Sequence, residues 1–293
     1  MNVPETLAVQ QELAAAQAEI EGLRAELDET NRGVLALYAE LDAQADALRH
    51  ATELKSRFLA YMSHEFRTPI GSIRSIARLL IDRLDGPLTP EQEKQVRFIQ
   101  DTSAEFADMV NDLLDLAKVE AGRVEISADW FELVDLFSTL RGMFKPILAT
   151  SDVKLVFEDP HGVPRLFNDD HKLAQILRNF ISNALKFTSA GEVRVSASIN
   201  PGDTVTFAVR DTGIGIAPEF QQVIFEDFAQ IDLPIQKRLR GTGLGLSLSR
   251  HLAELLGGSV SLQSAAGAGS TFSVTLPLRL DTPTAGNTGE ASA

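Results

Sequence analysis

The chain contains no cysteine among its 293 residues. It can therefore form no disulfide, carry out no thiol catalysis and build none of the usual structural zinc sites. It also lacks any apolar run of about 18 or more residues, so we expect no membrane span. The acidic start of the chain lacks the basic and apolar regions of a signal peptide, and a cytoplasmic location is expected.

Basic residues are in the minority, with 27 Lys and Arg against 41 Asp and Glu and a formal net charge of −14. Phosphate backbones repel such a chain, so we expect no nucleic-acid partner. The acidity by itself is explained most simply as keeping the surface soluble. Hydrophobic residues make up 44% of the chain, which at this length is enough for two domains with a sizeable core.

A heptad pattern extends from residue 4 to about residue 57, and we assign residues 1–56 to an N-terminal coiled-coil helix. One apolar seam runs along it in steps of three and four, interrupted only by Thr30 and Gln44. Gly33 beside the seam is either a soft point or a tolerated helical glycine. The seam consists of Leu13, Ala16, Ile20, Leu23, Leu27, Thr30, Val34, Leu37, Leu41, Gln44, Leu48 and Ala51.

Residues 57–122 predict a helical hairpin. The first helix continues to about Leu84 and bends at Pro69, where a backbone donor is missing. After an Asp-Gly-Pro break, Thr89 restarts a helix as its N-cap, with Gln92 at the capping-box position. The apolar faces exceed what one hairpin can bury. Two hairpins are therefore expected to form a dimeric four-helix bundle.

Beyond Gly122 the pattern changes to short strand-like runs that alternate with helices. This alternation predicts an α/β sandwich domain over residues 123–280. Residues 281–293 are small and polar and predict a disordered tail. The expected strands are 153–158, 192–199, 204–210, 259–264 and 270–278, and the expected helices are 133–148, 169–187 and 245–256.

The segment FLAYMSHEFRTP, from Phe58 to Pro69, places three reactive side chains in the first hairpin helix. His64 and Thr68 are four residues apart on one helix face, and Glu65 is adjacent. A carboxylate at one imidazole nitrogen makes the other nitrogen a better nucleophile. A surface histidine alone is more often just solvated. This segment therefore indicates a catalytic function only together with other motifs.

Four such motifs follow in order. They are DDHKLAQILRNFISNALKFT (Asp169–Thr188), DTGIG (Asp211–Gly215), FEDF (Phe225–Phe228) and RGTGLGL (Arg240–Leu246). In the first, Asn179 and Asn183 share a helix face with Lys186, and carboxamide oxygens suit a hydrated Mg²⁺ that also holds ATP phosphates. Two solvated asparagines would be the simpler explanation if this motif stood alone.

Together the five segments resemble the H box, N box, first glycine box, F box and second glycine box of the sensor histidine kinases of two-component systems. The resemblance covers roughly residues 50 to 280. One glycine box alone is a weak signal, whereas five boxes in the family's order are specific. The resemblance implies a coiled coil, a dimeric four-helix bundle and then an α/β sandwich ATP-binding domain of the Bergerat type.

The resemblance also implies roles for individual residues. His64 would be the phosphoacceptor, Glu65 its general base and Thr68 the residue that positions water for dephosphorylation of a partner. Asn183 would bind Mg²⁺, with Asn179 in support. The remaining expected nucleotide-binding residues are Lys186, Asp211 (on the adenine amine), Gly213, Gly215, Phe225, Phe228, Arg238, Arg240, Gly241, Gly243 and Gly245.

Residues 216–240 are long for a loop and predict a mobile lid over the nucleotide. Phe225 and Phe228 are its expected anchors, and Lys237 joins Arg238 and Arg240 as a possible phosphate contact. The glycines of the second box lead into a helix whose N–H groups can bind phosphate.

One difference separates the chain from ATPases of the gyrase and heat-shock chaperone type, which its nucleotide domain also resembles. Those ATPases carry a water-activating glutamate where this chain has Asn179. Without that base, water attack is disfavoured and ATP is preserved for His64. Two positions depart from the kinase pattern: Gly71 stands where a polar residue is common, and Arg240 stands where a glycine often precedes the box.

The sequence thus predicts a protein-histidine kinase that autophosphorylates His64 and passes the phosphoryl group to an aspartate of a response regulator, which it also dephosphorylates. The expected partners are a second copy in a homodimer, the regulator's receiver domain and a separate sensor protein on the coiled coil, since no sensor domain fits in residues 1–50. A phosphatase-dominant or scaffold protein is the alternative. A serine kinase of the anti-sigma type is a third, but it leaves HEFRTP without a role.

Overall fold

The computed structural model describes residues 3–84, 86–148, 152–160, 162–229 and 242–280. The chain divides into two compact units, Met1–Arg57 and Phe58–Ala293. Within the described ranges, no helix combines the length and the apolar character that a membrane crossing needs.

Helix α1, Val3–Ile81, is one continuous helix that carries both the heptad segment and His64. It continues through Pro69 as expected and ends slightly before the predicted Leu84. The bend at Pro69 stays a prediction. In the first unit, the described apolar seam residues from Ile20 to Leu48 are all exposed, Val34 least at 43%. A single copy of this helix therefore leaves these described seam residues uncovered.

Helix α2, Pro90–Glu120, begins as its sequence predicts. The Thr89 hydroxyl accepts a hydrogen bond from the Gln92 backbone N–H at 3.3 Å, and the Gln92 side chain accepts one from the Thr89 N–H at 2.9 Å. This reciprocal capping box satisfies two helix-start donors that would otherwise lack a partner. Gly122 ends the helix region with a left-handed φ of 63°.

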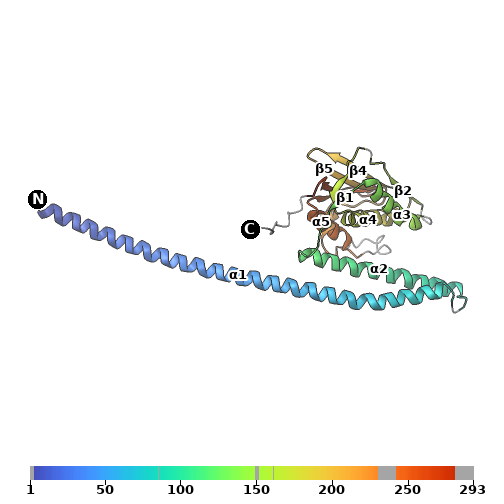
Figure 1. The fold of residues 1–293 in the computed structure, drawn as a ribbon, viewed down its shortest axis with the longest axis horizontal. Helices are drawn as coiled ribbons and strands as arrows, with labels where there is room; N and C mark the ends of the chain where they lie inside the picture. The colour runs from blue at the N-terminus through green and yellow to red at the C-terminus, as the bar shows by residue number, and fades with distance from the viewer. Residues whose placement is uncertain (1–2, 85, 149–151, 161, 230–241, 281–293) are drawn as a thin grey trace, which may run out of the picture. The chain divides into compact units, whose positions relative to one another are not determined.

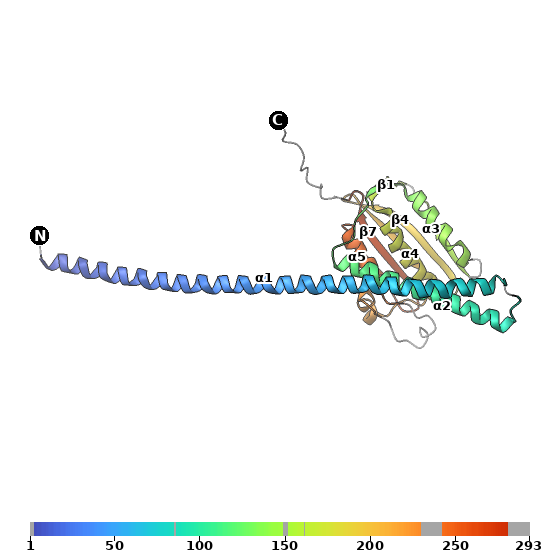
Figure 2. The ribbon, with the colours of Figure 1, turned by 60° about the horizontal axis from the view of Figure 1, so that its bottom comes forward.

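The hairpin of the second unit packs α2 alongside the end of α1 (Figure 2). Ser63, Ile70 and Ala77 recur every seven residues on α1 and are buried. Phe66 of α1 meets Phe106 of α2 edge-on, with their ring centroids 5.8 Å apart. One apolar face of α1 therefore packs against α2 within the hairpin.

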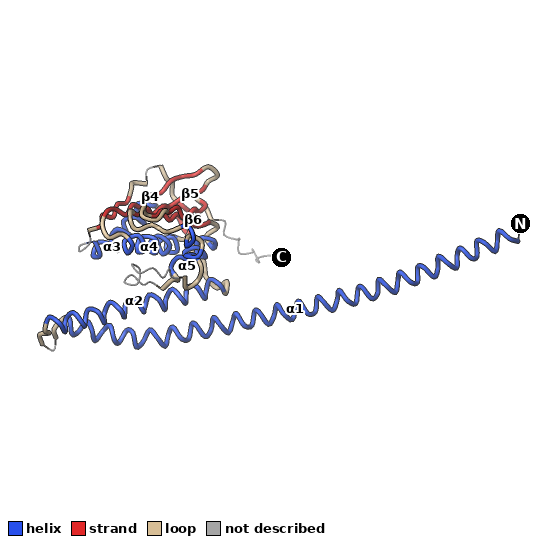
Figure 3. The backbone as a smooth tube through the Cα atoms, turned by 180° about the vertical axis from the view of Figure 1, so that it is seen from behind, coloured by secondary structure: helices blue, strands red, loops and turns tan. Residues whose placement is uncertain are grey.

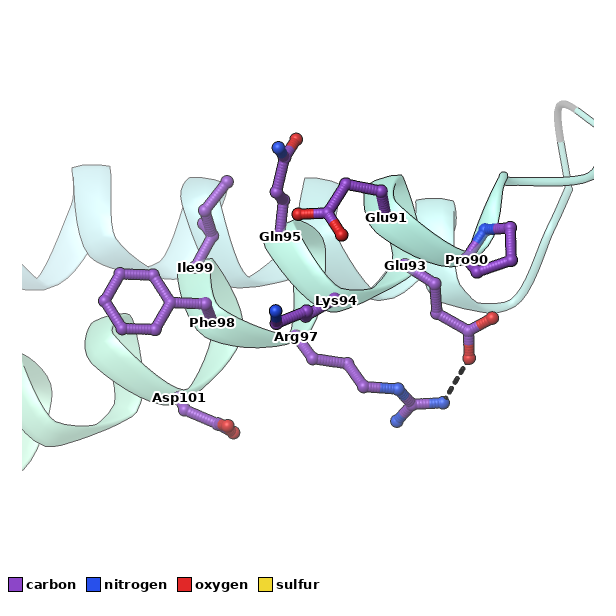
Figure 4. A pocket seen from close by; sticks show the side chains of 9 residues that line it. All are labelled: Pro90, Glu91, Glu93, Lys94, Gln95, Arg97, Phe98, Ile99 and Asp101. Atoms are coloured by element: carbon purple, nitrogen blue, oxygen red, sulfur yellow. Dashed lines mark hydrogen bonds and ion pairs between the residues drawn. The ribbon is translucent and has the colours of Figure 1, made fainter.

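A second apolar set on the hairpin stays open. Phe98 is 72% exposed and Ile99 46%, and both line a groove on the N-terminal part of α2, beside the Glu93–Arg97 ion pair (Figure 4). Other exposed members are Ile73, Ile76, Leu79 and Met109. The hairpin thus carries more apolar surface than it covers, as the sequence pattern predicts.

The α/β domain is built on a mixed five-stranded sheet in the order β2-β4-β5-β7-β6. Strand β2 runs parallel to β4, and every other neighbouring pair is antiparallel. The strands are β2 Val153–Phe157, β4 Gly191–Asn200, β5 Thr204–Asp211, β6 Ser259–Ser264 and β7 Ser270–Pro277. All five match the expected strands to within one or two residues.

Three helices cover one face of this sheet (Figures 1 and 3). They are α3 Leu133–Leu148, α4 Asp170–Phe187 and α5 Gly245–Leu255. Alternate residues of the central strands, such as Val205, Phe207 and Val209, point into the core and are fully buried. They meet the apolar stripe of α4, including Ile176 and Phe180. The α/β sandwich expected from the sequence is confirmed.

A small second sheet pairs β1, Asp129–Phe131, with β3, Leu166–Asn168. We did not predict it, because three residues are too few to show an alternating pattern. Two 3₁₀ turns, Pro218–Phe220 and Val223–Phe225, lie within the predicted lid segment.

The end of α2 packs against the α/β domain. Leu116 belongs to the domain's buried core. The Gln175 side chain on α4 donates to the Asp115 carboxylate on α2 at 2.9 Å. The hairpin and the α/β domain are therefore in direct contact within the second unit.

Asp112 lies in this contact, and its titration gives a testable stability profile. Burial raises the pKa of Asp112 to about 6; Arg178 opposes the rise, and Asp108 and Asp115 add to it. The folded state then binds the proton more tightly than the unfolded state. Unfolding free energy should consequently fall as the pH rises from about 4 to about 6 and then level off.

We expect Asp112→Asn to remove this slope and to stabilise the protein at pH 7 by about 1–2 kcal/mol, a value reduced from the full shift because the carboxyl is only half-buried. Denaturant unfolding measured from pH 4 to pH 8 checks this. Asp101→Asn, an exposed position on the same helix, is the control. An unchanged pH slope in Asp112→Asn would show that another group is responsible.

Candidate functional site

His64 is on the outside of the hairpin, with 77% of its side chain exposed. Its Nδ1 lies 3.7 Å from the Glu65 carboxylate, longer than a hydrogen bond. Catalytic hydrogen bonds are often long before the substrate binds. Glu65 therefore approaches the exposed imidazole on its Nδ1 side.

Thr68 lies one turn beyond His64, as predicted. Its hydroxyl donates to the His64 backbone oxygen at 3.5 Å and is exposed on the same helix face. Ser63, directly before His64, is buried at 2% exposure, and its hydroxyl has no partner among the described residues. His64, Glu65 and Thr68 are thus exposed on α1, while Ser63 turns inward.

The helix with the two asparagines is anchored by Asp169. This N-cap carboxylate accepts hydrogen bonds from the Lys172 N–H at 3.0 Å, the Lys172 ammonium at 2.8 Å and the Ser127 N–H at 2.9 Å. Burial raises the pKa of Asp169, but these donors outweigh it and hold the pKa below its usual range. Asp169 therefore stays ionised and fixes the start of α4.

Asn179, Asn183 and Lys186 share one side of α4 and are partly buried. The Asn183 carboxamide has no hydrogen-bond partner among the residues that the structure describes. Burial lowers the pKa of the Lys186 ammonium, against the attraction of Glu105 on α2. Lys186 also lies 5.6 Å from the Phe187 ring centroid. Asn183 and Lys186 can therefore meet an anionic ligand and its cation, whereas the Asn179 amide donates to Gly245 and Ser249.

Asp211 ends β5 and is 5% exposed. Its carboxylate accepts the Gly213 backbone N–H at 2.8 Å and also the backbone N–H of Ser270. Burial raises the pKa of Asp211, and these two donors oppose the rise. The carboxylate is thus held in a fixed orientation, as a base-recognising acceptor must be.

The turn after Asp211 needs its glycines for packing. Gly215 has a left-handed φ of 65°, and a Cβ there would collide with the Ala265 carbonyl. A Cβ on Gly213 would collide with the Phe187 carbonyl at the end of α4. The Ile214 N–H donates to that same carbonyl at 3.3 Å. The structure therefore joins the N box to the first glycine box; the approach of this turn to an adenine base stays a prediction.

The two phenylalanines of the F box differ. Phe225 packs edge-on against Phe272 of the core, with their centroids 6.3 Å apart. Phe228 is 61% exposed and has a left-handed φ of 61°, which is unusual for a bulky residue. Phe225 thus packs on the core and Phe228 does not; their role as anchors of the lid stays a prediction.

The second glycine box is described only from Thr242 onward. Lys237, Arg238, Arg240 and Gly241 lie outside the described residues, so their predicted phosphate contacts and the lid itself stay predictions. Gly243 has a φ of 74°, and a Cβ there would come within 2.8 Å of the backbone of Phe228 and Ala229. The F box and the second glycine box are therefore in direct contact.

Magnesium is the one metal that the sequence implies. Among the described side chains, no three His, Cys, Asp or Glu residues gather as a metal site. The partnerless Asn183 carboxamide still fits Mg²⁺, because this ion usually takes one or two protein oxygens and fills its octahedron with phosphates and water. Bound there, Mg²⁺ would supply charge neutralisation to the phosphates.

Two residues at this site were missed from the sequence. Ser270 orients Asp211 through its backbone, which no side-chain pattern reveals. Thr188, the last residue of the N-box motif, is 3% exposed, and its hydroxyl has no partner among the described residues. The position of Thr188 within the motif Asp169–Thr188 was the only sequence feature that could have drawn attention to it.

Two family models match the chain. Residues 54–122 match the "His Kinase A (phospho-acceptor) domain". Residues 168–280 match the "Histidine kinase-, DNA gyrase B-, and HSP90-like ATPase". The first contains His64, and the second contains Asn179, Asn183, Asp211 and both glycine boxes.

Named relatives agree with these matches. The Autoinducer 2 sensor kinase/phosphatase LuxQ of Vibrio harveyi is 35% identical over 252 residues, which are 82% of this chain and 29% of that protein. The Histidine protein kinase DivJ of Caulobacter vibrioides is 37% identical over 83% of this chain and 40% of its own length. The chain thus spans less than half of the relatives it matches.

A solved structure supports the same assignment. Full-length ShkA in complex with AMPPNP is 34% identical and superposes with a TM-score of 0.63, over 75% of this chain and 45% of that one. A phosphoacceptor hairpin with an exposed histidine, followed by an α/β domain whose N box and glycine boxes are in contact, is the arrangement that the sequence motifs imply. The chain therefore belongs to the sensor histidine kinase family of two-component systems.

Proposed function

We propose that this chain binds Mg²⁺-ATP in its α/β domain and transfers the γ-phosphoryl group to Nε2 of His64. Glu65 receives or orients the imidazole proton at Nδ1, so that the other nitrogen can attack phosphorus. The observation that carries this proposal is the exposure of His64 beside Glu65 on α1. Because the imidazole is open to solvent, core packing gives no reason for a histidine at this position.

In the α/β domain, Asp211 would recognise the adenine amine, and Asn183 and Lys186 would meet the metal and the phosphates. The start of α5 would supply backbone N–H groups. Asn179 offers no carboxylate to activate water, so ATP is reserved for the imidazole. The phosphohistidine would then pass its phosphoryl group to an aspartate of a response regulator.

We further propose that the chain acts as a homodimer. The exposed seam of α1 and the open apolar set of the hairpin are both surfaces that a second copy would bury. A separate sensor protein on the N-terminal helix would then act on the dimer.

Labelling with γ-³²P-ATP and Mg²⁺ tests the kinase assignment. We expect incorporation that is lost in acid and stable in alkali, as for a phosphoramidate. Addition of a receiver domain should remove the label from the kinase. Acid-stable label would indicate a hydroxyl acceptor and a serine kinase, and no label with intact ATP binding would favour the phosphatase or scaffold alternative.

Thr68→Ala should impair dephosphorylation of the regulator about tenfold or more while autophosphorylation changes by less than about twofold. The Thr68 hydroxyl lies one turn from His64, where it can orient a water, and it is not needed for attack on ATP. The measurement is the decay of phosphorylated regulator with and without the variant. Equal losses in both activities would contradict this division of roles.

Insertion of one residue near Gln44 should change the ratio of kinase to phosphatase activity, because α1 is one helix from the seam to His64 and the insertion rotates one part against the other. Insertion of seven residues should largely restore the ratio, since seven returns the seam to phase. If all insertions from one to seven leave activity unchanged, the coiled coil only holds the dimer together.

A further inference from the structure

The Asn179 side chain uses both of its amide protons on protein acceptors. Its Nδ2 donates to the Gly245 backbone oxygen at 3.1 Å and to the Ser249 hydroxyl at 3.3 Å. Ser249 is fully buried, and its hydroxyl donates to the same Gly245 oxygen at 2.7 Å. These three groups form a closed triangle that ties α4 to the first turn of α5.

Helix α5 depends on such outside contacts for its orientation. Leu244, its N-cap, provides no side-chain cap. The Leu244 N–H is taken by the Thr242 hydroxyl at 3.1 Å, and the Leu244 carbonyl accepts the first helical bond from the Leu248 N–H at 2.9 Å. The next N–H groups, at Gly245, Leu246 and Ser247, are donors that have no partner within the helix itself. Fixing the Gly245 carbonyl fixes where these donors point.

We infer that Asn179 is a positioning residue that holds the first turn of α5 so that its N–H groups meet the nucleotide phosphates. This inference rests on the proposed nucleotide binding and assigns Asn179 to the phosphate-binding helix, in place of direct support of Mg²⁺. A carboxylate at position 179 has no proton for either acceptor and would be repelled by the Gly245 oxygen. The amide is therefore needed for what it donates.

The space around Gly245 shows that this joint does not depend on the absence of a side chain there. A Cβ on Gly245 would lie 3.6 Å from the Asn179 side chain, an ordinary packing distance. Gly245 is thus not excluded by space from carrying a side chain, unlike Gly243. The joint between α4 and α5 is made by hydrogen bonds.

Asn179→Asp tests the inference, because it keeps the size of the side chain and removes both donors. We expect the dissociation constant for AMPPNP to rise about ten- to a hundredfold, in Mg²⁺ and in EDTA alike. Adenosine, which has no phosphates, should bind as it does to the unmodified protein. Asn200→Asp, at the far end of β4 from the strand pair Val193–Asp211, is the matched control and should bind both ligands normally.

A double-mutant cycle supplies a second measurement. Asn179→Ala and Ser249→Ala should each weaken AMPPNP binding, and the double variant should be much less impaired than the product of the two effects, because either change opens the same triangle.

Three results would overturn the inference. They are unchanged AMPPNP affinity in Asn179→Asp, equal loss for AMPPNP and adenosine, and a loss confined to Mg²⁺, which would make Asn179 a cation-site residue. If the unmodified protein binds no AMPPNP, the proposed function fails first, so the two failures are distinguishable.

Discussion

His64→Gln is expected to reduce autophosphorylation to background while ATP binding stays within about twofold of the unmodified protein. Glutamine fits the exposed site on α1, where the imidazole is 77% open to solvent, and it contributes no nucleophilic nitrogen. The residues proposed to bind the nucleotide belong to α4, β5 and α5 and do not include His64. The readouts are ³²P incorporation from γ-labelled ATP and the dissociation constant of AMPPNP.

His50 provides a matched control for this experiment. It is an exposed histidine on the same helix, two heptads before His64. His50→Gln should be labelled at the normal rate. Label retained in His64→Gln would disprove the phosphoacceptor assignment, and loss of label in both variants would point to a general effect on α1.

Asn183→Asp is expected to lower the kinase rate about a hundredfold and to weaken ATP binding in Mg²⁺. The substitution alters the oxygen set offered to the cation and adds a negative charge beside phosphates. Lys186 lies three residues further along the same side of α4, and burial lowers the pKa of its ammonium. Filter-binding and labelling assays across a range of Mg²⁺ concentrations measure both effects.

Asn200→Asp again serves as the control, because it makes the same chemical change at the remote end of β4. Titration in EDTA separates the two asparagines. The Asn183→Asp defect should depend on Mg²⁺, whereas that of Asn179→Asp should not. Normal affinity and turnover of Asn183→Asp in Mg²⁺ would mean that this face of α4 does not hold the metal.

The elements that were predicted well are those whose pattern is local. The capping box at Thr89 and Gln92 depends on four consecutive residues, and it forms as expected. Strands β4 and β5 alternate apolar and polar residues over eight or more positions, and their bounds were close. Strands β1 and β3 are three residues each, and only their pairing with each other makes them strands.

The candidate site divides in the same way. The motifs indicated which residues matter, since His64, Asn183 and Asp211 stand within recognisable sequence segments. They did not indicate that Ser270 orients Asp211 from another strand, nor that Phe228 faces outward. Those facts depend on residues that are 59 positions apart in one case (211 to 270) and on a left-handed backbone in the other.

The sequence by itself determined the family and the order of the helical and α/β parts, because periodicity and motif spacing are properties of nearby residues. Only the tertiary structure decided which groups accept the amide protons of Asn179. Its two acceptors, Gly245 and Ser249, lie 66 and 70 residues further along the chain. An amide in a sequence offers a donor and an acceptor equally, and it is the folded neighbour that selects between them.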